Sequence, residues 1–150
     1  MKSVYVGIAM IASLVAGAGS SLAAEPTFLN SGKVSPTTLP FSELVEAGDT
    51  LYLSGQIGNV PGSLKLAEGG ISAETTQVMD NIKTSLEAHG YAMTNLVKCT
   101  VMLADISEWG AFNDVYKGYF EAGRFPARAA FGASGLALGA RVEVDCIGVK

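Results

Sequence analysis

The sequence is poor in the residues that most often bind metals or act as nucleophiles. Its 150 residues include one histidine and two cysteines. Cys99 and Cys146 form no Cys-x-x-Cys motif, and no Cys/His spacing typical of a zinc site is present. His89 stands beside Gly90 at the expected end of a helix, where we expect a solvated side chain without a catalytic role. These absences argue against a metal site and against histidine chemistry.

Basic residues are also scarce. The chain has 10 Lys and Arg against 14 Asp and Glu, which gives a net charge of −4. Affinity for nucleic acids comes mainly from Lys and Arg side chains that neutralise phosphates. We therefore expect no nucleic-acid partner.

No apolar run is long enough to be an ordinary membrane span. The run from Val4 to Ala18 has about 15 residues, whereas a span needs roughly 20. Lys2 precedes this run and small residues follow it, an order typical of a secretory signal peptide over residues 1–24. We predict cleavage after Ala23 or Ala24 and export to the periplasm, with no membrane contact afterwards; an uncleaved anchor is the alternative.

Export bears on both cysteines, because an oxidising compartment permits a disulfide. In a strand-like segment, Cys99 is two residues from Val97 and from Val101, and Cys146 is two residues from Val144. Each cysteine should therefore point to the same strand face as those valines. Both side chains are therefore expected on the apolar faces of their strands. Two buried thiols are the favoured interpretation, since a bridge also requires the two strands to be neighbours in register.

Residues 36–150 show no repeat, low-complexity tract or long linker, so we expect one domain after an N-terminal extension at residues 25–35. Ser72 and Ser107 are expected to cap two helices. The expected elements are strands at 39–48 and 50–58 around a Gly48-Asp49 turn, a helix at 72–90, a strand at 96–105, a helix at 107–123, and strands at 127–133 and 141–149.

The order β-β-α-β-α-β-β predicts an α/β (α+β) fold, a two-layer sandwich with two helices on one face of a five- or six-stranded sheet. Alternation in the last strand directs Val142 and Val144 to the helices and Glu143 to the open face. An open sheet face in so small a domain is commonly covered by self-association. We therefore expect a homo-oligomer, with Glu143 in a subunit contact or a neighbouring cleft.

Arg128 follows Pro126-Ala127 and precedes a run of small apolar residues, an unusual place for a charge. Its guanidinium is a planar fork suited to a carboxylate. One interpretation is a binding site for a carboxylate ligand. The other is a structural ion pair between Arg128 and Glu143 or Asp145.

Several segments resemble, in order and spacing, the YjgF/RidA family of reactive-intermediate imine deaminases. The resemblance covers residues 36–150, nearly the whole chain after the predicted signal peptide. Its most specific pieces are Ser54-Gly55-Gln56, Asn113-Asp114-Val115-Tyr116, Pro126-Ala127-Arg128 and Val142-Glu143-Val144.

The resemblance implies a fold like chorismate mutase of the AroH type, assembled as a homotrimer with three clefts between subunits. It implies cofactor-free hydrolysis of a 2-imino acid, or of an enamine such as 2-aminoacrylate, to the 2-oxo acid and ammonia. Arg128 would bind the substrate carboxylate, and Glu143 would position the water. Ser54, Asn113 and the backbone at Ala130 match positions that line the family's cleft.

Some residues depart from the family pattern. Phe41 stands at a substrate-binding position where the family often has tyrosine, so a hydroxyl is missing. Ala129 and Ala130 remove polar side chains but keep backbone amides.

Two further functions stay open: a trimeric binding protein for small carboxylates in which Glu143 is structural, and an endoribonuclease, which the acidic charge and the export signal disfavour.

Overall fold

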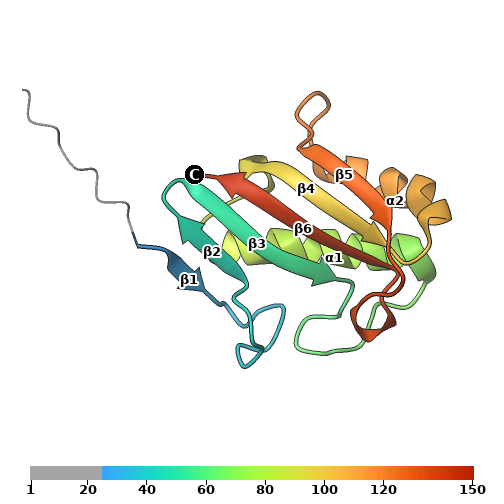
Figure 1. Ribbon diagram of the computed structural model, residues 1–150, viewed down its shortest axis with the longest axis horizontal. Helices are drawn as coiled ribbons and strands as arrows, with labels where there is room; N and C mark the ends of the chain where they lie inside the picture. The colour runs from blue at the N-terminus through green and yellow to red at the C-terminus, as the bar shows by residue number, and fades with distance from the viewer. Residues whose placement is uncertain (1–24) are drawn as a thin grey trace, which may run out of the picture.

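A single sheet covered by two helices on one face forms the molecule (Figure 1). The computed structural model describes residues 25–150, so the predicted signal peptide lies outside the described residues. The mixed α+β fold is confirmed. Its principal elements are β1 (Thr27–Leu29), β2 (Leu44–Ala47), β3 (Thr50–Ile57), α1 (Gly70–Ala88), β4 (Leu96–Leu103), α2 (Trp109–Tyr116), β5 (Ala127–Gly132) and β6 (Val142–Val149).

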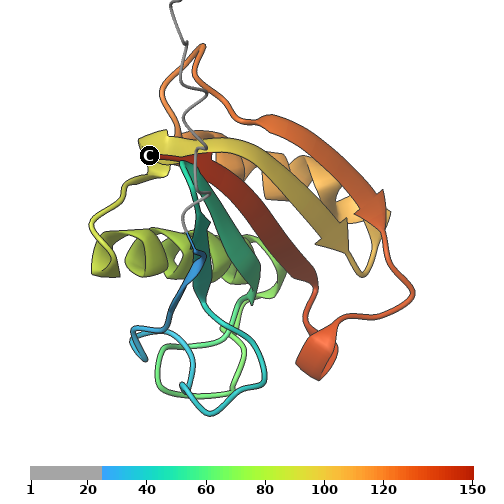
Figure 2. The same ribbon diagram turned by 60° about the vertical axis from the view of Figure 1, so that its left-hand side comes forward.

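The sheet has six strands in the order β1-β2-β3-β6-β4-β5. Among the strands of residues 25–150, only β4 and β5 pair in parallel, because the crossover between them contains α2. Figure 2 shows both helices on the same side of the curved sheet, which leaves the other face open. β1 was not expected: it has three residues and pairs with β2, and so short a segment shows no clear alternation.

The hairpin at Gly48-Asp49 is confirmed, with Gly48 in the left-handed region at a φ of 59°. The helix caps were predicted wrongly. α1 begins after Gly69, so Ser72 lies inside the helix. Asp105, instead of Ser107, supplies the side-chain cap of the second helical segment by accepting the Ser107 N–H at 2.9 Å.

The second helical segment is also shorter than expected. α2 ends at Tyr116 and continues as one 3₁₀ turn over Lys117–Tyr119. Within the described part of the chain, no helix combines the length and hydropathy needed to cross a membrane.

The core lies between the helices and the inner face of the sheet. In β6, Val142 and Val144 are fully buried and Glu143 is not, which confirms the predicted alternation. In β4, Val97 is 43% exposed whereas Cys99 is buried, so the prediction that their side chains share one face of the strand is wrong. A register irregularity between Leu96 and Lys98 changes the alternation at this point.

Cys99 and Cys146 form a disulfide, so the expectation of two buried thiols is wrong. The two residues are direct partners in the antiparallel pairing of β4 with β6, with Cα atoms 4.1 Å apart. This close spacing is typical of a pair not joined by ladder hydrogen bonds. The bridge therefore ties together two adjacent strands at the centre of the core.

Candidate functional site

Arg128 lies on β5 with its side chain against α2. Its guanidinium carbon is 4.6 Å from the centroid of the Tyr116 ring and 5.5 Å from that of Phe112. Its Nη2 donates a 2.6 Å hydrogen bond to the Asn113 side-chain oxygen. Aromatic faces attract a cation, so these contacts hold the guanidinium in one place before any ligand arrives.

Two adjoining hollows of about 260 and 380 Å³ open beside Arg128. Ala130 lines the first and Asn113 the second, while Trp109 lines both. Within residues 25–150 no carboxylate lies at ion-pair distance from Arg128, so the suggested pairing with Glu143 or Asp145 does not form. We call Asn113, Arg128 and Ala130 the Arg128 half-site; its cation is free to bind an anion.

Glu143 lies on the open face of β6, opposite Ile57 of β3 and Met102 of β4. Its carboxylate lies over Gly55, where an added Cβ would collide with it. No donor among the described residues bonds to this carboxylate. Burial, and to a lesser degree the charge of Asp145, raises the pKa of Glu143 above its ordinary value.

Phe41, Gly55 and Glu143 line one hollow of about 290 Å³, and we call these three residues the Glu143 half-site. Phe41 is 49% exposed. Ser54, predicted to line the cleft, donates its hydroxyl to the Ser42 carbonyl at 2.6 Å. That bond attaches the segment carrying Phe41 to β3, so Ser54 supports the wall of this half-site.

The two half-sites are separated within one chain. Arg128 points towards the helices, whereas Glu143 points away from them. β4 lies between β5 and β6, so the two residues are also about two strand spacings, roughly 10 Å, apart across the sheet. The structure thus groups Phe41 with Glu143, and Asn113 and Ala130 with Arg128, without bringing the groups together.

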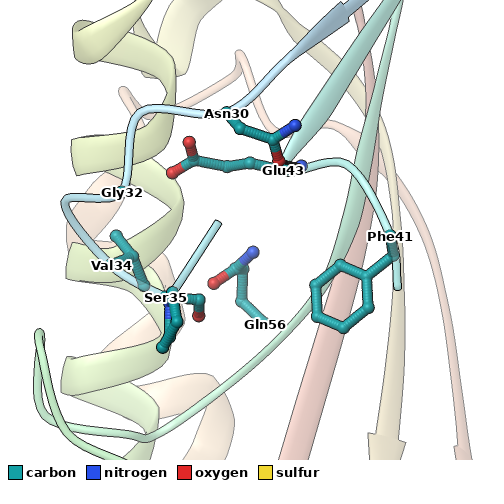
Figure 3. Close-up of a pocket in the computed structure, with 8 residues that line it drawn as sticks. Asn30, Gly32, Val34, Ser35, Phe41, Glu43 and Gln56 are labelled. Carbon is teal, nitrogen blue, oxygen red and sulfur yellow. Dashed lines mark hydrogen bonds between the residues drawn. The ribbon is translucent and has the colours of Figure 1, made fainter. Parts of the chain in front are cut away.

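A second glutamate, Glu43, was missed by the sequence analysis. It is 8% exposed and borders a small pocket, at whose other end Figure 3 shows Phe41. Glu43 Oε1 accepts the Ser85 hydroxyl at 2.6 Å, and Oε2 accepts the Ser31 N–H at 2.7 Å. Burial raises the pKa of Glu43, but the hydrogen bonds together outweigh burial and hold this pKa below its ordinary value.

His89 belongs to this cluster. Its Nε2 lies 3.3 Å from Glu43 Oε2, and its side chain is 11% exposed. The expectation of a solvated His89 is therefore wrong, because the segment just before β2 brings the Glu43 carboxylate to the end of α1. Its partner lies 46 residues away in sequence, and no local signal marks the pair.

Comparisons with known proteins agree with the fold and with the quoted motifs. Residues 32–150 match the family model described as Endoribonuclease L-PSP. The 2-iminobutanoate/2-iminopropanoate deaminase of Capra hircus is 47% identical over 111 residues, which cover 74% of this chain and 80% of the relative.

Two solved structures are also similar. A putative endoribonuclease L-PSP from Entamoeba histolytica has a TM-score of 0.78 and 36% identity, covering 84% of this chain and 100% of the other. RidA from an Antarctic Psychrobacter has a TM-score of 0.77 and 33% identity, covering 83% of this chain and 99% of the other. The chain therefore belongs to the Endoribonuclease L-PSP family, which the sequence motifs indicated under the name YjgF/RidA.

Proposed function

We propose that the protein hydrolyses 2-imino acids and their enamine tautomers to 2-oxo acids and ammonia, and that it does so as a homotrimer. The name of the goat relative supports this reaction. The observation that carries the proposal is the separation of two groups that lack partners among residues 25–150: Arg128, a cation without an ion pair, and Glu143, a carboxylate without a donor. Each is complementary to a different part of a 2-imino acid.

The size of the substrate explains why two copies of the chain are needed. In a 2-imino acid the carboxylate is bonded directly to the imine carbon, so its anchor and the attacking water must lie close together. Arg128 and Glu143 of one chain face opposite sides of the sheet. The Arg128 half-site of one copy would therefore have to meet the Glu143 half-site of another.

The open sheet face supplies a surface for this contact. Tyr52 and Phe131 lie on it, 48% and 49% exposed, and Val149 of β6 is 43% exposed. Large apolar side chains collected on one face favour association. A closed threefold arrangement would bury this face and repeat the same cleft at each interface.

In the proposed reaction, Arg128 orients the substrate through paired hydrogen bonds to its carboxylate. Glu143 accepts a proton from water as the water oxygen adds to the imine carbon. The nitrogen of the resulting tetrahedral intermediate gains two protons, one returned by Glu143 and one released by the hydroxyl group, and leaves as ammonia. The hydroxyl oxygen, having lost its proton, becomes the carbonyl oxygen of the 2-oxo acid. A raised pKa brings Glu143 closer to the working pH, which favours proton transfer.

The residues that differ from the family pattern are compatible with this scheme. Phe41 offers an apolar ring where a hydroxyl is often found, so Glu143 would hold the water without it. β5 is an edge strand, and an edge presents backbone N–H groups that can bind a ligand near Ala130. The Cys99–Cys146 disulfide supports the proposed export to the periplasm.

One alternative has an observation in its favour. The Arg128 half-site is held together by contacts within a single chain, so it could bind a small carboxylate without turnover. Ribonuclease activity, which the family description names, is disfavoured by the net charge of −4.

The test is ammonia release from 2-imino acids generated in situ by an amino-acid oxidase. We expect Arg128→Ala to lower kcat/KM by about 10²–10⁴-fold, because two charge-assisted hydrogen bonds are lost. Arg124→Ala is the matched control, since Arg124 is an exposed arginine four residues away that lines neither half-site. Absence of any acceleration by the unmodified protein would favour the binding function, and a monomer in light scattering would remove the shared cleft.

A further inference from the structure

The hollow at the Glu143 half-site is larger and more apolar than water positioning requires. It measures about 290 Å³. Besides Gly55 and Glu143, large apolar residues form much of its wall. These residues are Leu39, Phe41, Ile57, Leu64 and Leu138.

Two leucines on this wall are strongly exposed. Leu64 is 55% exposed and Leu138 is 57% exposed, and they come from separate loops. Single exposed leucines need no explanation. Two that meet Phe41 around one hollow, beside a carboxylate to which no described residue donates, form the kind of exposed apolar cluster that is typical of binding surfaces.

Leu138 also has an unusual backbone conformation. Its φ is 57°, and it is the one non-glycine residue in the described part of the chain with a positive φ. The left-handed region is uncommon for a branched side chain and easy for glycine. The turn over Ala137–Gly139 therefore holds a leucine at the hollow where a glycine would fit the backbone better.

The two side-chain amides in the hollow already donate hydrogen bonds to backbone carbonyls. Asn59 donates its amide to the carbonyls of Val34 and Ser63 at 3.4 and 3.2 Å. Gln56 donates to the Ser54 carbonyl at 3.4 Å. An apolar occupant would leave these bonds intact, whereas an acidic one would meet the negative charge of Glu143.

We propose that this hollow binds the side chain of the imino acid, and that Leu138 and Leu64 select imines with bulky apolar side chains over imines of alanine size. The inference rests on the proposed function. The imine carbon carries three substituents: the nitrogen, the carboxylate and the side chain. With the carboxylate on Arg128 of a neighbouring copy and the carbon beside the water on Glu143, the side chain is directed into the hollow.

The experiment compares kcat/KM for imines made in situ from alanine, leucine, phenylalanine and glutamate. We expect the leucine and phenylalanine imines to exceed the alanine imine by about tenfold or more, and the glutamate imine to be the poorest substrate. Leu138→Gly should reduce the leucine-to-alanine ratio by about tenfold. Glycine adopts the φ of residue 138 freely, so loss of folding is not the expected cause.

Two control variants make this test specific. Leu138→Met keeps an apolar side chain and should preserve the ratio. Val97→Ser removes an exposed apolar side chain at the end of β4 far from Met102, the β4 residue that pairs with Glu143. This variant should also preserve the ratio. An unchanged ratio in Leu138→Gly would overturn the inference. A parallel loss for all imines together with loss of the oligomer would overturn it too, by showing that Leu138 is only a subunit contact.

A binding measurement separates this inference from the proposed function. Calorimetry with pyruvate and 4-methyl-2-oxopentanoate, the products of the alanine and leucine imines, requires no turnover. If no imine is hydrolysed, the deaminase proposal fails. Tighter binding of the larger oxo acid, lost in Leu138→Gly, would still support the hollow, and equal binding of both would overturn it.

Discussion

Glu43, just before β2, and Glu143, within β6, are both glutamates, and folding changes their pKa values in opposite directions. Glu43 accepts hydrogen bonds from Ser85 and Ser31 and has a lowered pKa despite its burial. Glu143 has no donor in the described part of the chain, and burial raises its pKa. A carboxylate whose bonding capacity is satisfied serves structure, whereas a half-buried one without partners is available for chemistry.

The largest expected effect separates the two glutamates by activity. Glu143→Gln keeps the size of the side chain but removes its basicity, so kcat should fall by about 10²–10⁴-fold. Binding of a 2-oxo acid, measured by calorimetry, should persist because Arg128 is untouched. Equal turnover in the variant and the unmodified protein would place Glu143 among the structural residues.

The next effect concerns the strand that carries Glu143. The disulfide joins β6 to β4 across a sequence separation of 47 residues. A Cys99→Ala/Cys146→Ala double variant should lose about 2–4 kcal/mol of stability in urea unfolding. Reductant should weaken the unmodified protein and leave the double variant unchanged; equal sensitivity of both would show that the cysteines are not bridged.

A smaller loss of stability is expected at Glu43. Glu43→Ala leaves the buried Ser85 hydroxyl without its acceptor, which should cost about 1–3 kcal/mol. The measurement is urea unfolding, with Glu46→Ala as a control because that carboxylate bonds near the protein surface. A loss no greater than that of the control would mean that the cluster with Ser31, Ser85 and His89 adds little to stability.

The smallest effect is the pH dependence of stability, which should have opposite signs at the two sites. Glu43 has a folded pKa below the ordinary 4.5, so its stabilisation is present above pH 4.5 and is lost as pH falls through the folded pKa. Glu143 has a folded pKa above 4.5, so it destabilises the fold as pH rises past 4.5, and this penalty disappears in acid.

Thermal unfolding as a function of pH tests these signs. The Glu143→Gln variant should be more stable than the same protein with Glu143 at neutral pH, and the two should have similar stability in acid. The comparison is best made in an Arg128→Ala background, which removes the cation that a neighbouring copy would contribute in the proposed trimer. A Glu143→Gln variant less stable than its parent at pH 7 would mean that Glu143 gains a partner on assembly.

The parts of the fold that the sequence predicted depend on local rules. The period of two in β6 was enough to direct Glu143 to the open face, and Gly48-Asp49 was enough to locate a hairpin turn. Arg128 was recognised as unusual from its apolar neighbours in sequence. These features need only one strand, one turn or one short motif, so they can be inferred without knowing the register of the sheet.

The parts that were missed depend on contacts between distant segments. The disulfide required β4 and β6 to place Cys99 directly opposite Cys146. The burial of His89 required the Glu43 carboxylate, which lies just before β2. The separation of Arg128 from Glu143 required the position of β4 between their strands. The alternation of side chains along a single strand carries no information about which strands are neighbours.

The collision between Glu143 and any side chain at position 55 has a consequence for evolution. The first atom that an added Cβ meets belongs to the carboxylate, so a substitution at Gly55 would displace the proposed catalytic group before it disturbed the backbone. Positions 55 and 143 should therefore change together among related chains. A relative that fills position 55 should also have given up its glutamate, which makes this pair of positions a guide to which relatives have kept the proposed Glu143-dependent reaction.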